Sequence, residues 1–221
     1  MAWSDPGDFT SGQILTAAQM DSVREAMFFG QATFTNEAAR DAAIPATGIT
    51  LQEGMRAYLT APTAPAATGL VTAVPTGITT VYNGSAWVCA TPVGANTVTS
   101  GTTASATYTP TLAGGGTNPS VTLTTGTTAQ VMFSSRMTMA GTSSAVFVSV
   151  AVSGATTLAA SDNYGAHYAV ATSGYYVTAS QQIILTGLTS GVNTFTLQYR
   201  SGAPAITGTF VYRTITVQGI A

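Results

Sequence analysis

The segment Ser180–Val217 constrains the fold more than any other part of the chain, because its side chains alternate in character with a period of two. Apolar and polar residues take turns in the first run: Phe195, Leu197 and Tyr199 against Thr194, Thr196, Gln198 and Arg200. A second run places three apolar residues on one face, with an arginine as the exception: Val211, Arg213, Ile215 and Val217. This alternation predicts antiparallel strands with one buried face.

Similar runs recur from Thr97 onward, separated by Gly, Ser, Pro and Thr, which favour turns. The candidate strands are Thr97–Tyr108, Ser120–Leu123, Ala129–Met139, Ala145–Val152, Ala166–Ala171, Tyr175–Thr178, Gln182–Thr186, Thr194–Arg200 and Thr207–Val217. The clearest alternation is that of Val146, Val148, Val150 and Val152, followed by Val131, Phe133, Met137 and Met139. Many short strands without helices predict a mainly β fold, with an antiparallel β-sandwich of the jelly-roll kind.

Charge is scarce along the whole chain. Charged residues make up 6% of the sequence, lysine is missing, and the formal net charge is −2, whereas soluble domains carry about 25% charged residues. We therefore expect much of the surface to be buried against identical copies or neighbouring proteins. The sequence has no basic patch, which disfavours a nucleic-acid partner.

Cys89 is the single cysteine, so it cannot form an intrachain disulfide, and we predict that it is a small buried apolar residue. Residues 1–6 do not resemble a signal peptide, and no segment has the roughly 20 apolar residues that a membrane span needs. The expectations are a protein made in a cytoplasm, with no membrane insertion.

The first 35 residues read as an extended leader followed by a helix. Thr16 and Gln19 form a capping-box pattern at the start of the helix, and Gly30 follows its end near Phe29. Apolar residues precede the helix and form a stripe along it: Trp3, Phe9, Met20, Val23 and Met27. A helix this short needs a partner for its stripe. That partner is either the next domain of the same chain, or another protein or sister helix.

We predict that residues 36–93 form a short helix and a small β connector, and that residues 94–221 form the sandwich head. Asn36 can cap the helix, which should run to Ala43 and end before Pro45. Asn83-Gly84 predicts a hairpin with a two-residue turn.

Residues able to carry chemistry are few. His167 lies near Asp162, which allows a catalytic pair, but a structural or interface histidine is the simpler interpretation. One His and one distant Cys give no metal-ligand spacing, and nothing predicts a cofactor. A tyrosine cluster is the best candidate for a recognition or trimer surface: Tyr164, Tyr168, Tyr175 and Tyr176. The alternative, packing in a trimer core or between sheets, is favoured.

Three stretches resemble bacteriophage virion proteins. The leader, with Trp3-Ser-Asp-Pro and Thr16-Ala-Ala-Gln-Met-Asp-Ser-Val-Arg24, is similar to the amino-terminal segment of virion proteins from phages of actinobacteria, which usually have Asn where Asp21 stands. The set from Arg40 to Trp87 resembles a small β module of tail fibres. Gly187–Arg200 resembles the last strands of tail-fibre jelly-roll heads, which resemble tumour necrosis factor and complement globular heads.

The resemblance implies a homotrimeric minor tail or tail-fibre protein of the virion, without enzymatic activity. Its leader would bind other virion proteins, and its head would face outward towards a host-surface glycan or protein. One alternative is a head fibre or decoration protein mounted on the capsid. Another is a carbohydrate-cleaving tail enzyme, which needs a pair of carboxylates, while the head has Asp162 alone. A secreted adhesin is disfavoured because the signal peptide is missing.

Overall fold

The computed structural model describes residues 32–46, 50–141, 144–170, 174–204 and 206–221. Its elements, in chain order, are β1 (Ala32–Phe34), α2 (Glu37–Ala46), β2 (Arg56–Leu59), β3 (Ala66–Thr68), β4 (Val71–Ala73), β5 (Ile78–Tyr82), β6 (Trp87–Cys89), β7 (Val93–Thr97), β8 (Gly101–Thr103), β9 (Ser120–Thr125), β10 (Thr128–Ala140), β11 (Ser144–Gly154), η2 (Asp162–Tyr164), β12 (Ala166–Val170), β13 (Val177–Thr186), β14 (Gly191–Ser201) and β15 (Thr207–Ile220). The leader residues Trp3, Phe9, Met20, Val23 and Met27 lie outside the described residues.

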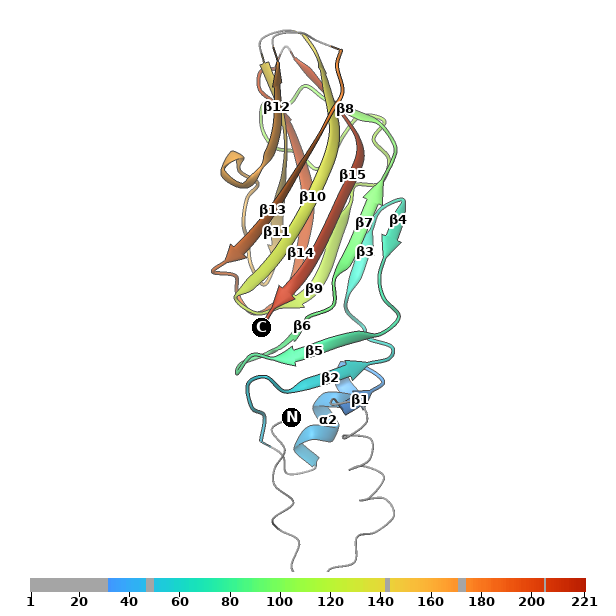
Figure 1. Ribbon diagram of the computed structural model, residues 1–221, viewed down its shortest axis with the longest axis vertical. Helices are drawn as coiled ribbons and strands as arrows, with labels where there is room; N and C mark the ends of the chain where they lie inside the picture. The colour runs from blue at the N-terminus through green and yellow to red at the C-terminus, as the bar shows by residue number, and fades with distance from the viewer. Residues whose placement is uncertain (1–31, 47–49, 142–143, 171–173, 205) are drawn as a thin grey trace, which may run out of the picture.

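Two sheets packed face to face form the head (Figure 1). One has the strand order β13-β10-β15-β7-β4, with β8 also paired to β15, and the other has the order β12-β11-β14-β9-β3. A smaller sheet, β1-β2-β5-β6, lies below the head, with α2 beneath it. The described part of the molecule is therefore elongated, with α2 near one end and the top of the head at the other.

The head strands pair in a nested series. β7 pairs with β15, β9 with β14, β10 with β13 and β11 with β12, all antiparallel. The eight strands from β7 to β15, β8 aside, thus pair first with last, second with seventh, and so on inward. This is the arrangement of a long hairpin rolled into two sheets, and it confirms the predicted jelly-roll sandwich.

Alternating side chains from both sheets fill the space between them. Phe195, Leu197 and Tyr199 of β14 are fully buried, as predicted, while their polar neighbours on that strand stay partly exposed. The alternating residues of β10 and β11 are buried in the same way: Val131, Phe133, Met137, Met139, Val146, Val148, Val150 and Val152. Period-two patterning therefore identified the inner faces of these strands correctly.

A β-bulge in β15 corrects the face assigned to that strand. The register with β10 shifts between Ser134 and Arg136, so that Tyr212 and Arg213 together lie opposite a single residue. Tyr212 has φ of 50°. Before the bulge Phe210 points inward, and after it the next side chain to point inward is that of Arg213. Arg213 is thus one of the inward residues with Ile215 and Val217, and Val211 is not, because the extra residue reverses the alternation.

The Arg213 guanidinium lies in the interior, where it is 1% exposed. Its Nη2 donates to the carbonyl oxygens of Thr99 (3.2 Å) and Gly115, and Nη1 donates to the Tyr199 hydroxyl at 3.5 Å. Tyr199 in turn donates to Asn118 at 2.8 Å. Buried charges need such partners, and these bonds tie two loops to the inside of the sandwich.

The connector follows the prediction in outline and differs in detail. Asn36 caps α2 by accepting a hydrogen bond from the Ala39 N–H at 2.9 Å. The helix continues through Pro45 to Ala46, because a proline in the last turn removes a single hydrogen bond. The predicted hairpin joins β5 and β6, but four residues connect the strands, 83–86, since Tyr82 pairs with Trp87.

The predicted boundary between residues 93 and 94 does not follow the sheets. β7 begins at Val93, and two short strands from the connector belong to the head: β3 pairs with β9, and β4 pairs with β7. Apolar residues of the small sheet, Leu59, Ile78 and Cys89, belong to the same buried cluster as the head core. The connector and the head therefore share one hydrophobic core.

Three predicted strand ranges also change. The predicted strand Thr97–Tyr108 is replaced by the end of β7, the short β8 and a loop. The separate strands predicted at 175–178 and 182–186 are one strand, β13, because Ser180 and Gln181 continue the ladder opposite β10.

Within the described ranges, no helix has the length and hydrophobicity of a membrane span.

We predict that Leu197→Ala lowers the free energy of unfolding by about 2–5 kcal/mol, since Leu197 is fully buried. The control is Thr196→Ala on the outer side of the same strand, which should change it by less than about 0.5 kcal/mol. Urea denaturation at matched protein concentration measures both values. Equal losses in the two variants would contradict the assigned inner face.

Candidate functional site

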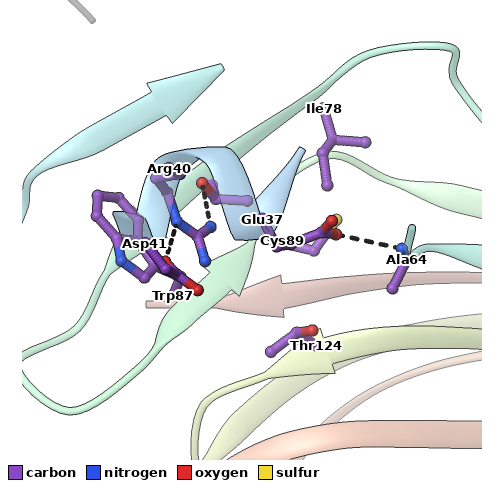
Figure 2. Close-up of a pocket in the computed structure, with 9 residues that line it drawn as sticks. Glu37, Arg40, Asp41, Ala64, Ile78, Trp87, Cys89 and Thr124 are labelled. Carbon is purple, nitrogen blue, oxygen red and sulfur yellow. Dashed lines mark hydrogen bonds and ion pairs between the residues drawn. The ribbon is translucent and has the colours of Figure 1, made fainter. Parts of the chain in front are cut away.

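A cavity of about 200 Å³ lies where α2, the small sheet and the head meet. It is lined by Glu37, Arg40, Asp41, Ala64, Ile78, Thr80, Trp87, Cys89 and Thr124. Figure 2 shows the α2 side chains on one side of this space and Thr124, from β9 of the head, on another. The cavity therefore marks the joint between the connector and the head.

Arg40 is the central cation of this joint and is 4% exposed. Its Nε donates to Asp41 Oδ1 at 2.8 Å, and its Nη1 donates to Thr80 Oγ1 at 3.3 Å. The guanidinium also stacks on Trp87, 4.6 Å from the ring centroid, a contact that is favourable for a cation. Arg40 thereby joins the helix to strands β5 and β6.

Glu37 fixes the first turn of α2 to the loop that precedes β3. Its carboxylate accepts hydrogen bonds from the Thr63 N–H (2.9 Å), the Thr63 hydroxyl (2.8 Å) and the Ala64 N–H (3.2 Å). Burial alone would raise the pKa of Glu37, but these bonds outweigh burial and hold the pKa below its usual value. Glu37 is therefore ionised at neutral pH, with its oxygens engaged.

Cys89 is a free, buried cysteine, as predicted. Burial raises the pKa of its thiol, and the sulfur donates to the Thr91 carbonyl at 3.5 Å. The thiolate is the reactive form of cysteine, so Cys89 acts here as a small apolar residue. The charged side chains around the cavity, Glu37, Arg40 and Asp41, hydrogen-bond to other groups of the chain. The cavity is therefore part of a structural joint between the connector and the head.

A second polar cluster lies on the outer side of the β12-β11-β14-β9-β3 sheet. His167, Phe147 and Arg200 are neighbours across β12, β11 and β14. The rings of Phe147 and His167 stack with centroids 5.5 Å apart, and the Arg200 guanidinium lies 3.6 Å from the centroid of Phe147. The phenylalanine ring is thus flanked by two nitrogen-bearing side chains.

Asp162 completes this cluster from the short helix η2. Arg200 Nε donates to its Oδ1 at 2.9 Å, and Nη2 donates to Oδ2. The Tyr108 hydroxyl donates to the same Oδ1 at 2.8 Å. The bonds from Arg200 hold the pKa of Asp162 below its usual value. The pKa of the Tyr108 hydroxyl is raised, mainly by burial and in addition by its hydrogen bond to Asp162.

This geometry bears on the catalytic hypothesis for His167. Asp162 bonds to Arg200 and Tyr108, and His167 contacts Phe147, so the described contacts do not form the His–Asp pair that a nucleophile would need. Across the described ranges, no group of three His, Cys, Asp or Glu residues could hold a metal ion.

The four tyrosines predicted as a surface are separated in the structure. Tyr168 faces the core of the sandwich, and Tyr164 packs against that core while donating to the Ala159 carbonyl. Tyr175 and Tyr176 are exposed, and Tyr176 stacks on Arg136 at 4.5 Å. Tyr164 and Tyr168 thus match the interpretation as inter-sheet packing, and the other two remain available at the surface.

Sequence reasoning did not find the two clusters around Arg40 and Arg200. Arg40 meets Thr80 across 40 positions, and Arg200 meets Asp162 across 38. The available signal was the scarcity of charge, because a rare arginine in an almost neutral chain marks a specific contact. The alternation of β14 also placed Arg200 on the outer face.

We predict that Asp162 titrates below the value of about 3.9 typical of an unfolded aspartate. A lowered pKa means that this pair contributes stability above the unfolded pKa, and that the contribution is lost as pH falls through the folded pKa. Arg200→Gln should return the pKa towards the unfolded value, whereas Arg136→Gln should not. Carboxyl NMR titration measures the shift, and an unchanged pKa in Arg200→Gln would exclude the pair as its cause.

We also predict that native Cys89 reacts with a soluble disulfide reagent more than about tenfold more slowly than in denaturant, since burial limits both access and thiolate formation. Trp87→Ala, which removes a wall of the cavity, should speed the reaction, while Trp87→Phe should change it less. With one cysteine in the chain, absorbance reports this site alone. Equal native and denatured rates would show that the thiol is open to solvent.

Comparison with known proteins gives matches among solved structures and none among family models or curated proteins. No model of a known protein family matches the chain, and no curated protein is similar to it in sequence. Among solved structures, the chain is similar to a CBM22-1–GH10 xylanase 10B of Clostridium thermocellum complexed with xylohexaose, with 16% identity and a TM-score of 0.30, over 48% of this chain and 23% of that one. The chain thus spans about a quarter of that protein.

Two carbohydrate-binding modules match the chain with similarly low sequence identities and TM-scores. TmCBM61 in complex with β-1,4-galactotriose has 13% identity and a TM-score of 0.24, over 56% of this chain and 68% of that one. The CBM22-1 xylan-binding domain of Paenibacillus barcinonensis Xyn10C has 12% identity and a TM-score of 0.24, over 52% and 81%. Because the TM-scores are this low, nothing about the ligand or activity of this chain is inferred from these similarities.

Proposed function

We propose that the chain is a structural protein of a bacteriophage virion: a homotrimeric tail-associated fibre or minor tail protein whose head faces outward. The observation that carries the proposal is the jelly-roll head set on a small connector, with β1, the first described strand, beside α2 and far from the top of the head (Figure 1). The resemblance of the leader to phage virion proteins assigns that end to attachment.

The chemistry of the head supports a role in contact. Asp162, its single carboxylate residue, is bonded to Arg200 and Tyr108. Hydrolysis of a glycosidic bond normally uses two carboxylates, so a carbohydrate-cleaving enzyme has less support than a binding or structural role. The outward partner in this proposal is a glycan or protein of the host surface.

The alternative position is on the capsid, as a head fibre or decoration protein. The scarcity of charge and the jelly-roll head suit both positions equally. A labelled antibody against the head, applied to purified particles and viewed by electron microscopy, distinguishes them. Label at the tail supports the proposal, and label on the capsid supports the alternative. If the protein is present in the preparation but the antibody labels no particle, both positions are contradicted.

We predict that removing residues 1–30 leaves a soluble trimer that no longer joins particles. Three leaders on one trimer bind far more tightly than one, because the first contact raises the effective concentration of the others. Replacing Met20, Val23 and Met27 by Ser in the full chain should weaken incorporation in the same direction. Quantitative blotting of purified virions gives the copy number, and a normal copy number for the shortened protein would place attachment elsewhere in the chain.

A further inference from the structure

The exposed apolar side chains of the head are concentrated on one of its two sheets. On the outer side of the β13-β10-β15-β7-β4 sheet, large apolar residues are exposed on four strands: Val71, Met132, Ile184, Tyr212 and Ile220. On the outer side of the other sheet, the corresponding exposed residue among those described is Val192 of β14. We call the former surface the neutral face.

The strand register makes the neutral face continuous. Met132 of β10 lies between Gln182 of β13 and Thr216 of β15, and Ile184 of β13 lies opposite Gln130. Between the apolar positions are hydroxyl and amide side chains, some of them already paired: Ser134 and Thr214 share a hydrogen bond of 2.8 Å. Apolar and uncharged polar groups therefore alternate across neighbouring strands.

Charge is nearly missing from this face. Its described residues include no carboxylate, and its one charged group, Arg136, stacks on Tyr176 towards the end of the sheet. The outer side of the opposite sheet instead carries Arg200 and His167, with Asp162 beside them. The two outer surfaces of the sandwich thus differ in chemistry, although the sheets share one core.

Tyr212 provides a second, independent observation. It is the one non-glycine residue with positive φ among the described residues, and it is 52% exposed. A tyrosine in this conformation is strained, and such strain persists where the surrounding structure or a function maintains it. The bulge that turns Arg213 inward also presents the Tyr212 ring at the neutral face. Aromatic residues and methionine are enriched at protein interfaces, where charged residues are depleted from the core.

We infer that the neutral face is the surface through which copies of this chain associate, and this inference rests on the homotrimer of the proposed function. A charged partner would find no complement here. A second copy need not bury an unpaired charge, whose burial is costly, because Arg136 lies towards the end of the sheet. Threonine, serine and glutamine each contain both a donor and an acceptor, so equivalent surfaces can hydrogen-bond to their own kind. The opposite face, with Arg200 and His167, remains open to other partners.

The test compares charge placed on each face. Ile184→Arg and Met132→Arg add a cation to the neutral face, and Val192→Arg is the matched control, since Val192 is as exposed as Ile184 (50% against 52%). Light scattering should give three times 22.3 kDa for the unaltered protein and for Val192→Arg. The two neutral-face variants should dissociate, with an association constant reduced more than about tenfold. Circular dichroism checks that each variant remains folded.

The outcomes separate the inference from the proposed trimer. A monomeric unaltered protein would overturn both. A trimer that persists unchanged in Ile184→Arg and Met132→Arg, or that dissociates equally in Val192→Arg, would overturn the inference and leave the trimer standing.

Hydroxyl-radical footprinting of the unaltered protein gives an answer even if a variant fails to fold. Met132 and Tyr212 should be more protected in the assembled protein than at dilutions where it dissociates, while Tyr175 keeps its reactivity. Equal protection of all three residues, or of none, would overturn the inference.

Discussion

The pairing of β15 with strands on both of its sides is the constraint on which the head depends. β15 is hydrogen-bonded to β10 over most of its length, and to β7 and β8 on the other side. Its inward residues Phe210, Ile215 and Val217 are all buried, and burying an apolar side chain of this size contributes about 1.5–3 kcal/mol. Without this last strand, one sheet would be divided into two unconnected parts, and the core would be open on that side.

The bulge in β15 sets the chemistry on both sides of that sheet at once. It turns Arg213 into the core and Tyr212 outward within two consecutive residues. Inside, the guanidinium bonds to two carbonyls and a hydroxyl, while its Nε has no partner in the described structure. Dehydrating a cation is costly, so this site favours the loop arrangement that brings the Thr99 and Gly115 carbonyls to it. One local irregularity in the backbone thereby orders two distant loops.

Local patterns in the sequence predicted the local features of the fold. Alternation over β14, β11 and β10 identified which residues are buried, because the period of a strand depends on neighbours only two positions apart. The same reasoning missed the inward Arg213, since a bulge is fixed by the partner strand. It also missed the place of β3 and β4 in the head sheets, and the contacts of Arg40 and Arg200. Those features depend on pairings between residues far apart in the chain, which the spacing of residues does not encode.

The nested order of the strands also governs when the head can form. β11 and β12 are close in sequence and can meet early, but β7 has to wait for β15, and Val93 finally pairs with Val217. Contacts between such distant residues make all-β domains slow to fold, on the order of milliseconds to seconds. As the chain is synthesised from its N-terminus, β7 and β9 exist before their later partners, with β4 and β3 able to cover one edge of each. These two short strands therefore shield edges that would otherwise invite pairing with another unfinished chain.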